Sequence, residues 1–252
     1  MDAVNDRLIQ HAGTPDLAWL PWLAAQQIRR LTMTSLASDQ CTLVVVAPHP
    51  DDEVLACGGL LALRAARGLP SMVVAVTDGE ASHGGRNLHA RAGLGFQRAE
   101  ESYSGLSVLG VPSSCVVRLG IPDGSVASCV QEIARKLQAL LKPTDVVVTT
   151  WSLDGHPDHE AASQAAKHAC KALGAQLVQA PVWMWHWAEP GDARIPWHDL
   201  VALDLPEHAV KAKQEALHCH RSQLVERSNG AGPVLMPSIV ERAARAQEYY
   251  FV

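Results

Sequence analysis

Apolar and polar positions along the chain form blocks that predict strands and helices in turn. Five short apolar runs have the length of strands, at residues 43–47, 72–76, 115–119, 145–150 and 177–183. Segments with helical spacing lie between them, at residues 53–67, 97–109, 126–141 and 159–173. Because strands that alternate with helices are joined by crossover connections, this order predicts an α/β fold with a Rossmann-like parallel sheet and helices on both faces.

The domain organisation follows from the same pattern. Runs 43–46 and 146–148 are apolar at every position, as expected for central strands that are buried on both sides. No repeat and no linker divides residues 41–252, so we expect a single domain there. Residues 1–40 are predicted to be an N-terminal helical extension, packed on the body or on a neighbouring subunit, because apolar residues recur at helical spacing: Leu17, Leu20, Ala24, Ile28 and Leu31.

Composition and charge exclude several classes of partner. The chain has 252 residues, of which 48% are hydrophobic and 19% charged, and its net charge is -5. This balance offers no basic surface for nucleic acid or for an anionic membrane. No segment approaches the roughly 20 apolar residues that span a bilayer, so no membrane insertion is expected. The six cysteines have no Cys-x-x-Cys spacing, which favours reduced thiols and a cytoplasmic location.

Two motifs follow predicted strands and contain residues that bind metals. His49-Pro50-Asp51-Asp52-Glu53 comes shortly after the first strand, and His156-Pro157-Asp158-His159 comes shortly after the fourth. The carboxyl ends of parallel strands meet at one edge of the sheet, where such folds bind ligands. The acidic triplet of the first motif could instead be a helix start, but helix capping does not explain His49 or the second pair of histidines. Together the motifs predict a site in which two imidazoles and one carboxylate leave a position open for water.

The motifs resemble those of the PIG-L/LmbE-like deacetylases, a metal-dependent family that includes N-acetylglucosaminyl-phosphatidylinositol de-N-acetylase. The resemblance covers residues 42–223 and makes residues 41–252 an LmbE-like deacetylase domain. It implies that the metal ligands are His49, Asp52 and His159. It further implies that Asp51 is the general base, that His156 stabilises the oxyanion, that Asp158 orients an imidazole, and that Arg98 and Asp123 contact the sugar.

The reaction implied by this resemblance is hydrolysis of an N-acetyl group on an N-acetylglucosamine-type substrate, which gives a free amine and acetate. Zn²⁺ is the expected metal and Fe²⁺ the alternative, because two histidines and one carboxylate suit both. The predicted partner is a small-molecule amino sugar, and a homo-oligomer is compatible with the family. Three other readings stay open: an amidase for a larger N-acyl or thiol-sugar conjugate, a non-haem iron oxygenase, and a non-catalytic nucleotide-binding module.

Several candidate residues have structural explanations as strong as the functional ones. Arg98 and Glu101 have the spacing of a helix-surface pair, and Asp123 lies in a Pro-Asp-Gly turn. Three tryptophans at alternating positions, residues 183, 185 and 187, would share one face of a strand and either stack on sugar or bury in a core. Of the His218-Cys219-His220 sequence, only His220 matches the family's His-x-Ser-Gln pattern, so the resemblance makes it a candidate pocket residue and the other two are expected to be structural.

Overall fold

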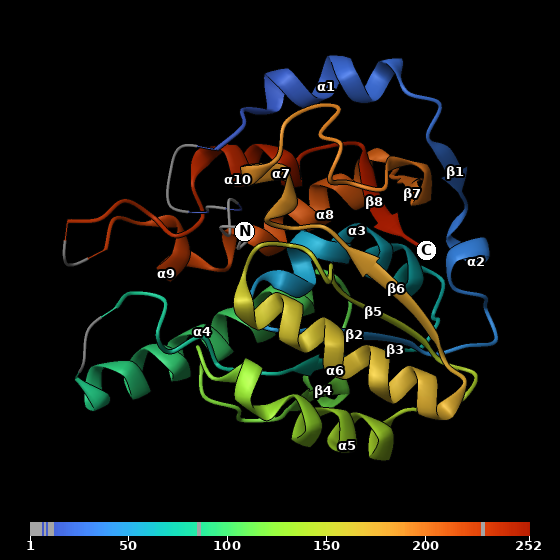
Figure 1. The fold of residues 1–252 in the computed structure, drawn as a ribbon. Coiled ribbons are helices and arrows are strands. Elements are labelled where there is room, and N and C mark those ends of the chain that lie inside the picture. The colour runs from blue at the N-terminus through green and yellow to red at the C-terminus, as the bar shows by residue number, and fades with distance from the viewer. Residues whose placement is uncertain (1–6, 8, 10–12, 85–86, 228–229) are drawn as a thin grey trace, which may run out of the picture.

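An eight-stranded sheet forms the centre of the molecule (Figure 1). The computed structural model describes residues 7, 9, 13–84, 87–227 and 230–252. The strand order is β1-β7-β8-β6-β5-β2-β3-β4, and every neighbouring pair is parallel except the two that include β8. The strands are β1 (Arg29–Leu31), β2 (Leu43–Ala47), β3 (Ser71–Ala75), β4 (Val116–Arg118), β5 (Val146–Thr150), β6 (Gln176–Ala180), β7 (Leu200–Asp204) and β8 (Gln247–Phe251).

Helices cover both faces of the sheet, which confirms the expected fold class (Figure 1). The α-helices are α1 (Asp16–Ala25), α2 (Met33–Leu36), α3 (Asp52–Ala66), α4 (Leu88–Val108), α5 (Val130–Leu140), α6 (Pro157–Leu173), α7 (Met184–Trp187), α8 (Glu207–His218), α9 (Arg221–Leu224) and α10 (Pro237–Ala243). Short 3-10 helices lie at Ser113–Cys115, Val126–Cys129 and Trp197–Asp199. No helix in these ranges is long and apolar enough to cross a membrane.

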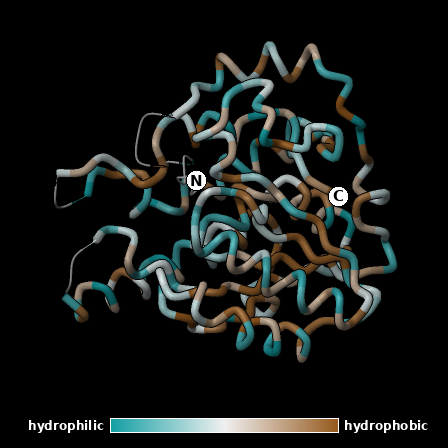
Figure 2. Tube along the Cα trace, in the orientation of Figure 1, coloured by the Kyte–Doolittle hydropathy of each residue, from teal (hydrophilic) through white to brown (hydrophobic). Residues whose placement is uncertain are grey.

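The side chains of β2 show why the central strands are apolar at every position. Leu43 and Val45 belong to one core cluster, which they form with residues of α3 and α8. Val44 and Val46 belong to a second cluster on the opposite face, formed with α5 and α6. Hydrophobic residues therefore run through the middle of the molecule along the strands (Figure 2).

Two local predictions are wrong. The strand expected over 177–183 ends at Ala180, and α7 begins at Met184, because the Asp154 carboxylate accepts the N–H groups of Val182, Trp183 and Met184 and so favours a helix start. The three indoles therefore do not share a strand face. Residues 29–31, which fit the helical spacing of the extension, form β1 and pair with β7, so tertiary pairing outweighs local periodicity there.

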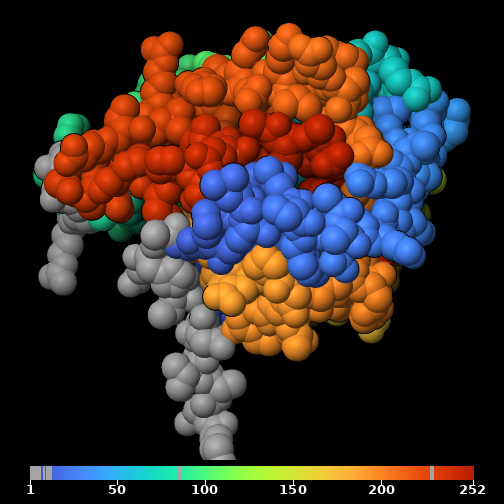
Figure 3. All heavy atoms as spheres, turned by 90° about the horizontal axis from the view of Figure 1, so that it is seen from above, coloured from blue at the N-terminus to red at the C-terminus, as the bar shows by residue number. Residues whose placement is uncertain are grey.

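The N-terminal helix α1 packs on the body of the protein. Trp19 is completely buried, and its Nε1 donates to the carbonyl of Trp185 at 2.9 Å. Asp16 forms a buried ion pair with Arg245 at the amino end of the helix. In Figure 3 the N-terminal segment, in blue, lies across elements from the C-terminal half of the chain, in orange and red. The division of the chain at residue 40 stays a prediction.

Helix α3, which carries Asp52, is interrupted at Cys57, whose φ of -152° and ψ of 29° are not helical. Beyond the interruption, Gly59 and Leu60 donate their N–H groups to the carboxylate of Glu248 at 2.7 and 2.9 Å. Lys213 of α8 donates to the same carboxylate at 2.7 Å. Glu248 thus satisfies the N–H groups that the break leaves open, and it ties α3 to β8 and α8.

Candidate active site

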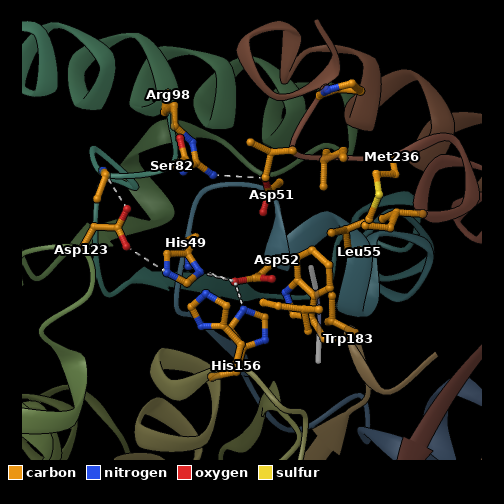
Figure 4. A pocket seen from close by; sticks show the side chains of 18 of the residues that line it. His49, Asp51, Asp52, Leu55, Ser82, Arg98, Asp123, His156, Trp183 and Met236 are labelled. Carbon is orange, nitrogen blue, oxygen red and sulfur yellow. Dashed lines mark hydrogen bonds and ion pairs between the residues drawn. The ribbon is translucent and has the colours of Figure 1, made fainter. Parts of the chain in front are cut away.

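Loops that follow β2 to β6 converge on one cavity of about 460 Å³ (Figure 4). His49 and Asp51 follow β2, Asp123 follows β4, and His156 follows β5; Trp183 follows β6. The expected convergence at the carboxyl edge of the sheet is therefore present, although these residues span more than a hundred positions of sequence.

Asp52 stands between the two imidazoles predicted as metal ligands. Its Oδ2 lies 3.2 Å from His49 Nδ1 and 3.2 Å from His159 Nε2. Two ligands of a tetrahedral zinc ion with bonds of about 2.0–2.1 Å are separated by roughly 3.3 Å. Each imidazole therefore stands at ligand spacing from the Asp52 carboxylate, and the three side chains are of the donor types that zinc binds.

In each of these two imidazoles, the nitrogen that does not face Asp52 is contacted by another carboxylate. Asp154 Oδ2 lies 2.8 Å from His159 Nδ1, and Asp158 and Asp123 each place an oxygen 3.3 Å from His49 Nε2. Such partners fix the ring orientation and the tautomer of a metal-binding histidine. Asp158 contacts an imidazole, as expected, but it is Asp154 that holds His159. Sequence reasoning missed Asp154; its position between β5 and the second motif is the signal that could have revealed it.

The charges around these imidazoles favour a bound cation. Burial lowers the pKa of His159, but the Asp52 and Asp154 carboxylates outweigh it and raise this pKa to about 9. Burial also opposes charge on His49, yet Asp123, Asp158 and Asp52 raise its pKa well above the ordinary value. A divalent cation between the rings would supply this positive charge in place of protons.

Asp51 has an unusual backbone conformation that turns its side chain toward Arg98. Its φ of 121° is the one positive φ of a non-glycine residue among the described residues, a conformation that costs about 1–3 kcal/mol. Asp51 makes no side-chain cap bond to α3, so helix capping does not explain it. Arg98 donates to Asp51 Oδ2 at 3.1 Å and to the Pro50 carbonyl at 2.6 Å, which holds the turn in place. Burial raises the pKa of Asp51 to about 7 despite the opposing charge of Arg98.

His156 is the residue before the first turn of α6, and Pro157 begins that helix, as the motif predicts. The His156 Nδ1 accepts the N–H of Asp158 at 3.2 Å, so the ring proton belongs on Nε2, which is left as a donor. Burial and the neighbouring His159 and His49 lower the pKa of His156 to about 3. Ring nitrogens of all three histidines lie within 4.8 Å of one another, which also puts His156 within reach of a shared cation.

The structure places the remaining candidates as follows. Arg98 is buried, at 2% exposure, so the helix-surface pair with Glu101 is wrong; Glu101 instead accepts from Ser222. Asp123 lines the cavity and accepts the N–H of Ala81 at 2.8 Å. His220 is completely buried and is not among the residues that line the cavity.

The tryptophans of residues 183–187 divide between the core and the cavity. Trp185 and Trp187 are buried in the cluster that α1 covers. Trp183 is half-buried and lines the cavity. Burial therefore explains two of the three indoles, and only Trp183 can touch a ligand there.

Fold and site together define an α/β protein with a candidate metal centre, and comparison with known proteins defines its family. The family profile "PIG-L: GlcNAc-PI de-N-acetylase" matches residues 44–170. A 1D-myo-inositol 2-acetamido-2-deoxy-alpha-D-glucopyranoside deacetylase of Actinosynnema mirum is 31% identical over 242 residues, covering 75% of this chain and 83% of that protein. The Corynebacterium diphtheriae protein of the same name is 28% identical over 222 residues, covering 72% and 75%.

Solved structures have the same fold. The conserved protein TT1542 from Thermus thermophilus superposes with a TM-score of 0.59 at 25% identity, covering 83% of this chain and 93% of the other. A deacetylase of the teicoplanin biosynthesis pathway has a TM-score of 0.64 at 18% identity, covering 83% and 96%.

The chain belongs to the PIG-L family. The expected enzyme class, a metal-dependent N-deacetylase, is confirmed by the family profile and by relatives that are named deacetylases. This assignment leaves no support for the iron oxygenase or for the non-catalytic nucleotide-binding module.

Proposed function

We propose that this enzyme uses a zinc ion to remove the N-acetyl group of an N-acetylglucosamine-type substrate. The observation that carries the proposal is the position of Asp52 Oδ2, 3.2 Å from a nitrogen of each of two imidazoles at the base of a cavity. The curated relatives, whose names specify deacetylation of a glucosaminyl inositol, support the substrate class. His49, Asp52 and His159 would hold the ion.

A bound zinc ion would lower the pKa of a water ligand and polarise the amide carbonyl. Asp51 serves as the general base: its side chain lines the cavity, and Arg98 donates a hydrogen bond to its Oδ2. The base takes a proton from the attacking water and returns it to the departing amine nitrogen. Breaking the C–N bond then yields acetate and the free amino sugar.

His156 supplies a donor for the oxygen that gains charge during attack. Its Nδ1 is engaged by the Asp158 N–H, so Nε2–H is the group left to donate. A fixed donor of this kind stabilises the tetrahedral intermediate without reorganising during the reaction. The ring lies 4.9 Å from His49 and 4.8 Å from His159 between centroids, close enough to act on the same carbonyl.

Zinc fits the mixed nitrogen and oxygen donors, and Fe²⁺ remains the alternative metal because the same set suits it. A cytoplasmic location and assembly into a homo-oligomer stay predictions.

The test is incubation of the zinc-loaded protein with a panel of N-acetylated amino sugars, followed by mass spectrometry for loss of an acetyl group. We expect acetate release that a chelator abolishes and that zinc restores. His49→Ala and His159→Ala should lose both the metal and the activity, since two remaining ligands hold zinc poorly. Full zinc content in both variants would overturn the ligand assignment.

A further inference from the structure

The cavity has two walls of different chemistry on opposite sides of the candidate metal ligands. In Figure 4 Ser82, Arg98 and Asp123 lie on one side of His49, and Leu55, Trp183 and Met236 lie on the other. We call the second side the apolar wall: Leu55, Trp183 and Met236 form it in Figure 4, and we include Val182, Leu235 and Ile239, which line the same cavity and are their neighbours in the chain or one helical turn away.

The apolar wall is built from three separate elements that are each anchored. Leu55 lies almost one helical turn after Asp52 on α3. The Asp154 carboxylate holds the N–H groups of Val182 and Trp183 at 2.9 and 3.0 Å. Leu235 is 3% exposed and donates its N–H to the Gln223 carbonyl at 2.9 Å. The wall is thus held by contacts within the packed structure.

The polar side is suited to the hydroxyl groups of a sugar. Ser82 lines the cavity, and its Oγ is buried without a hydrogen-bond partner among the described residues. A buried hydroxyl without a partner is costly, so a ligand oxygen would satisfy it. Asp123 Oδ1, which faces His49, is a further acceptor beside it. Arg98 also lines the cavity: its terminal nitrogens donate to the protein, while its Nε is buried without a hydrogen-bond partner among the described residues.

These positions favour one orientation of an amide substrate. If the sugar faces Ser82 and Asp123, and the amide lies over His49 and Asp52, then the acyl carbon chain extends toward the apolar wall. An acetyl group ends in one methyl and leaves most of that wall uncovered. Longer apolar chains gain free energy by burying methylene groups against it.

We propose that the apolar wall is an acyl subsite, so that the enzyme prefers N-acyl chains longer than acetyl on its amino sugar. This inference rests on the proposed function. If each added methylene is fully buried in the transition state, kcat/KM rises about fourfold per methylene. Butanoyl, with two more methylenes than acetyl, is therefore expected to gain roughly tenfold or more.

The experiment measures kcat/KM of the zinc-loaded enzyme on two series of glucosamine compounds. One series carries N-acetyl, N-propanoyl, N-butanoyl and N-hexanoyl groups on free glucosamine. The other keeps N-acetyl and carries methyl, butyl or hexyl glycosides. A rise along the N-acyl series supports the acyl subsite. Hydrolysis of N-acetylglucosamine with a flat or falling N-acyl series overturns it and leaves the proposed function intact.

A rise confined to the glycoside series also overturns the acyl subsite, because the wall would then bind the aglycone. No hydrolysis of any compound, with zinc bound, overturns both the inference and the proposed function.

Two polar variants of similar size test the wall directly. Val182→Thr and Met236→Gln should each lower the ratio of hexanoyl to acetyl kcat/KM several-fold, since they place a polar group against the chain. Val225→Thr is the matched control, because Val225 is exposed and does not line the cavity. An unchanged ratio in both wall variants, with zinc content equal to that of the control, overturns the proposal.

Discussion

Asp154→Asn tests whether this buried carboxylate positions His159. Asp154 is completely buried, and both of its oxygens are engaged. Oδ1 accepts the N–H groups of Val182 and Met184 at 2.9 and 3.0 Å, and Oδ2 accepts from Trp183 N at 3.0 Å and contacts His159 Nδ1 at 2.8 Å. Asparagine has the same shape but replaces one acceptor oxygen with a donor NH₂ group.

Either orientation of the new amide is unfavourable. If the NH₂ group faces Val182 and Met184, two buried N–H groups lose their acceptor. If it faces His159, the imidazole must accept at Nδ1, and its proton then sits on Nε2, the nitrogen directed at Asp52. Each buried group without a partner costs about 1–3 kcal/mol, so we expect a loss of roughly 2–6 kcal/mol in unfolding free energy. Because the ligand nitrogen is also disturbed, zinc affinity should fall about 10–100-fold.

The assay combines zinc competition against a chelator with urea denaturation of the metal-free protein. Asp145→Asn is the matched control: Asp145 is a buried carboxylate that accepts the N–H of Lys142 at 2.8 Å in a turn before β5, away from the cavity. The control should keep its zinc affinity and most of its stability, because the remaining amide oxygen can still accept the N–H of Lys142. Wild-type zinc affinity in Asp154→Asn would refute the positioning role, even if the variant were less stable.

Four further substitutions have defined expectations. Asp51→Asn should keep its zinc while kcat falls about 10²–10⁴-fold; loss of zinc would instead make Asp51 a ligand. His156→Ala should lower kcat about 10²–10³-fold with KM changed less, and near-normal kcat in the folded protein would remove the oxyanion role. Trp19→Ala should lower the free energy of unfolding, measured by urea denaturation, by about 3–5 kcal/mol, because α1 loses its buried indole. Glu248→Gln should cost about 3–5 kcal/mol by leaving the Lys213 ammonium without its buried charge partner, and an unchanged midpoint would contradict the capping of α3.

Local sequence determined much of the sheet and the place of the site. Continuous apolar runs identified β2 and β5, because a strand that is covered on both faces carries apolar side chains at successive positions. The two histidine motifs follow these neighbouring parallel strands, so their side chains had to meet at one edge. The topology predicted a site of two imidazoles and one carboxylate, and the resemblance to the PIG-L/LmbE-like family then pointed to His49, Asp52 and His159.

Tertiary structure decided the parts that depend on distant partners. Strand β1 exists because it pairs with the remote strand β7, and no periodicity within residues 29–31 reports that pairing. Arg98 is buried because the Asp51 turn and the Gly79 carbonyl give its guanidinium acceptors, whereas its spacing from Glu101 suggested a surface pair. The apolar wall joins α3, the end of β6 and the start of α10, segments that are unrelated in sequence. Short motifs encode which atoms can do chemistry, while the packing of remote segments decides their orientation and what surrounds the substrate.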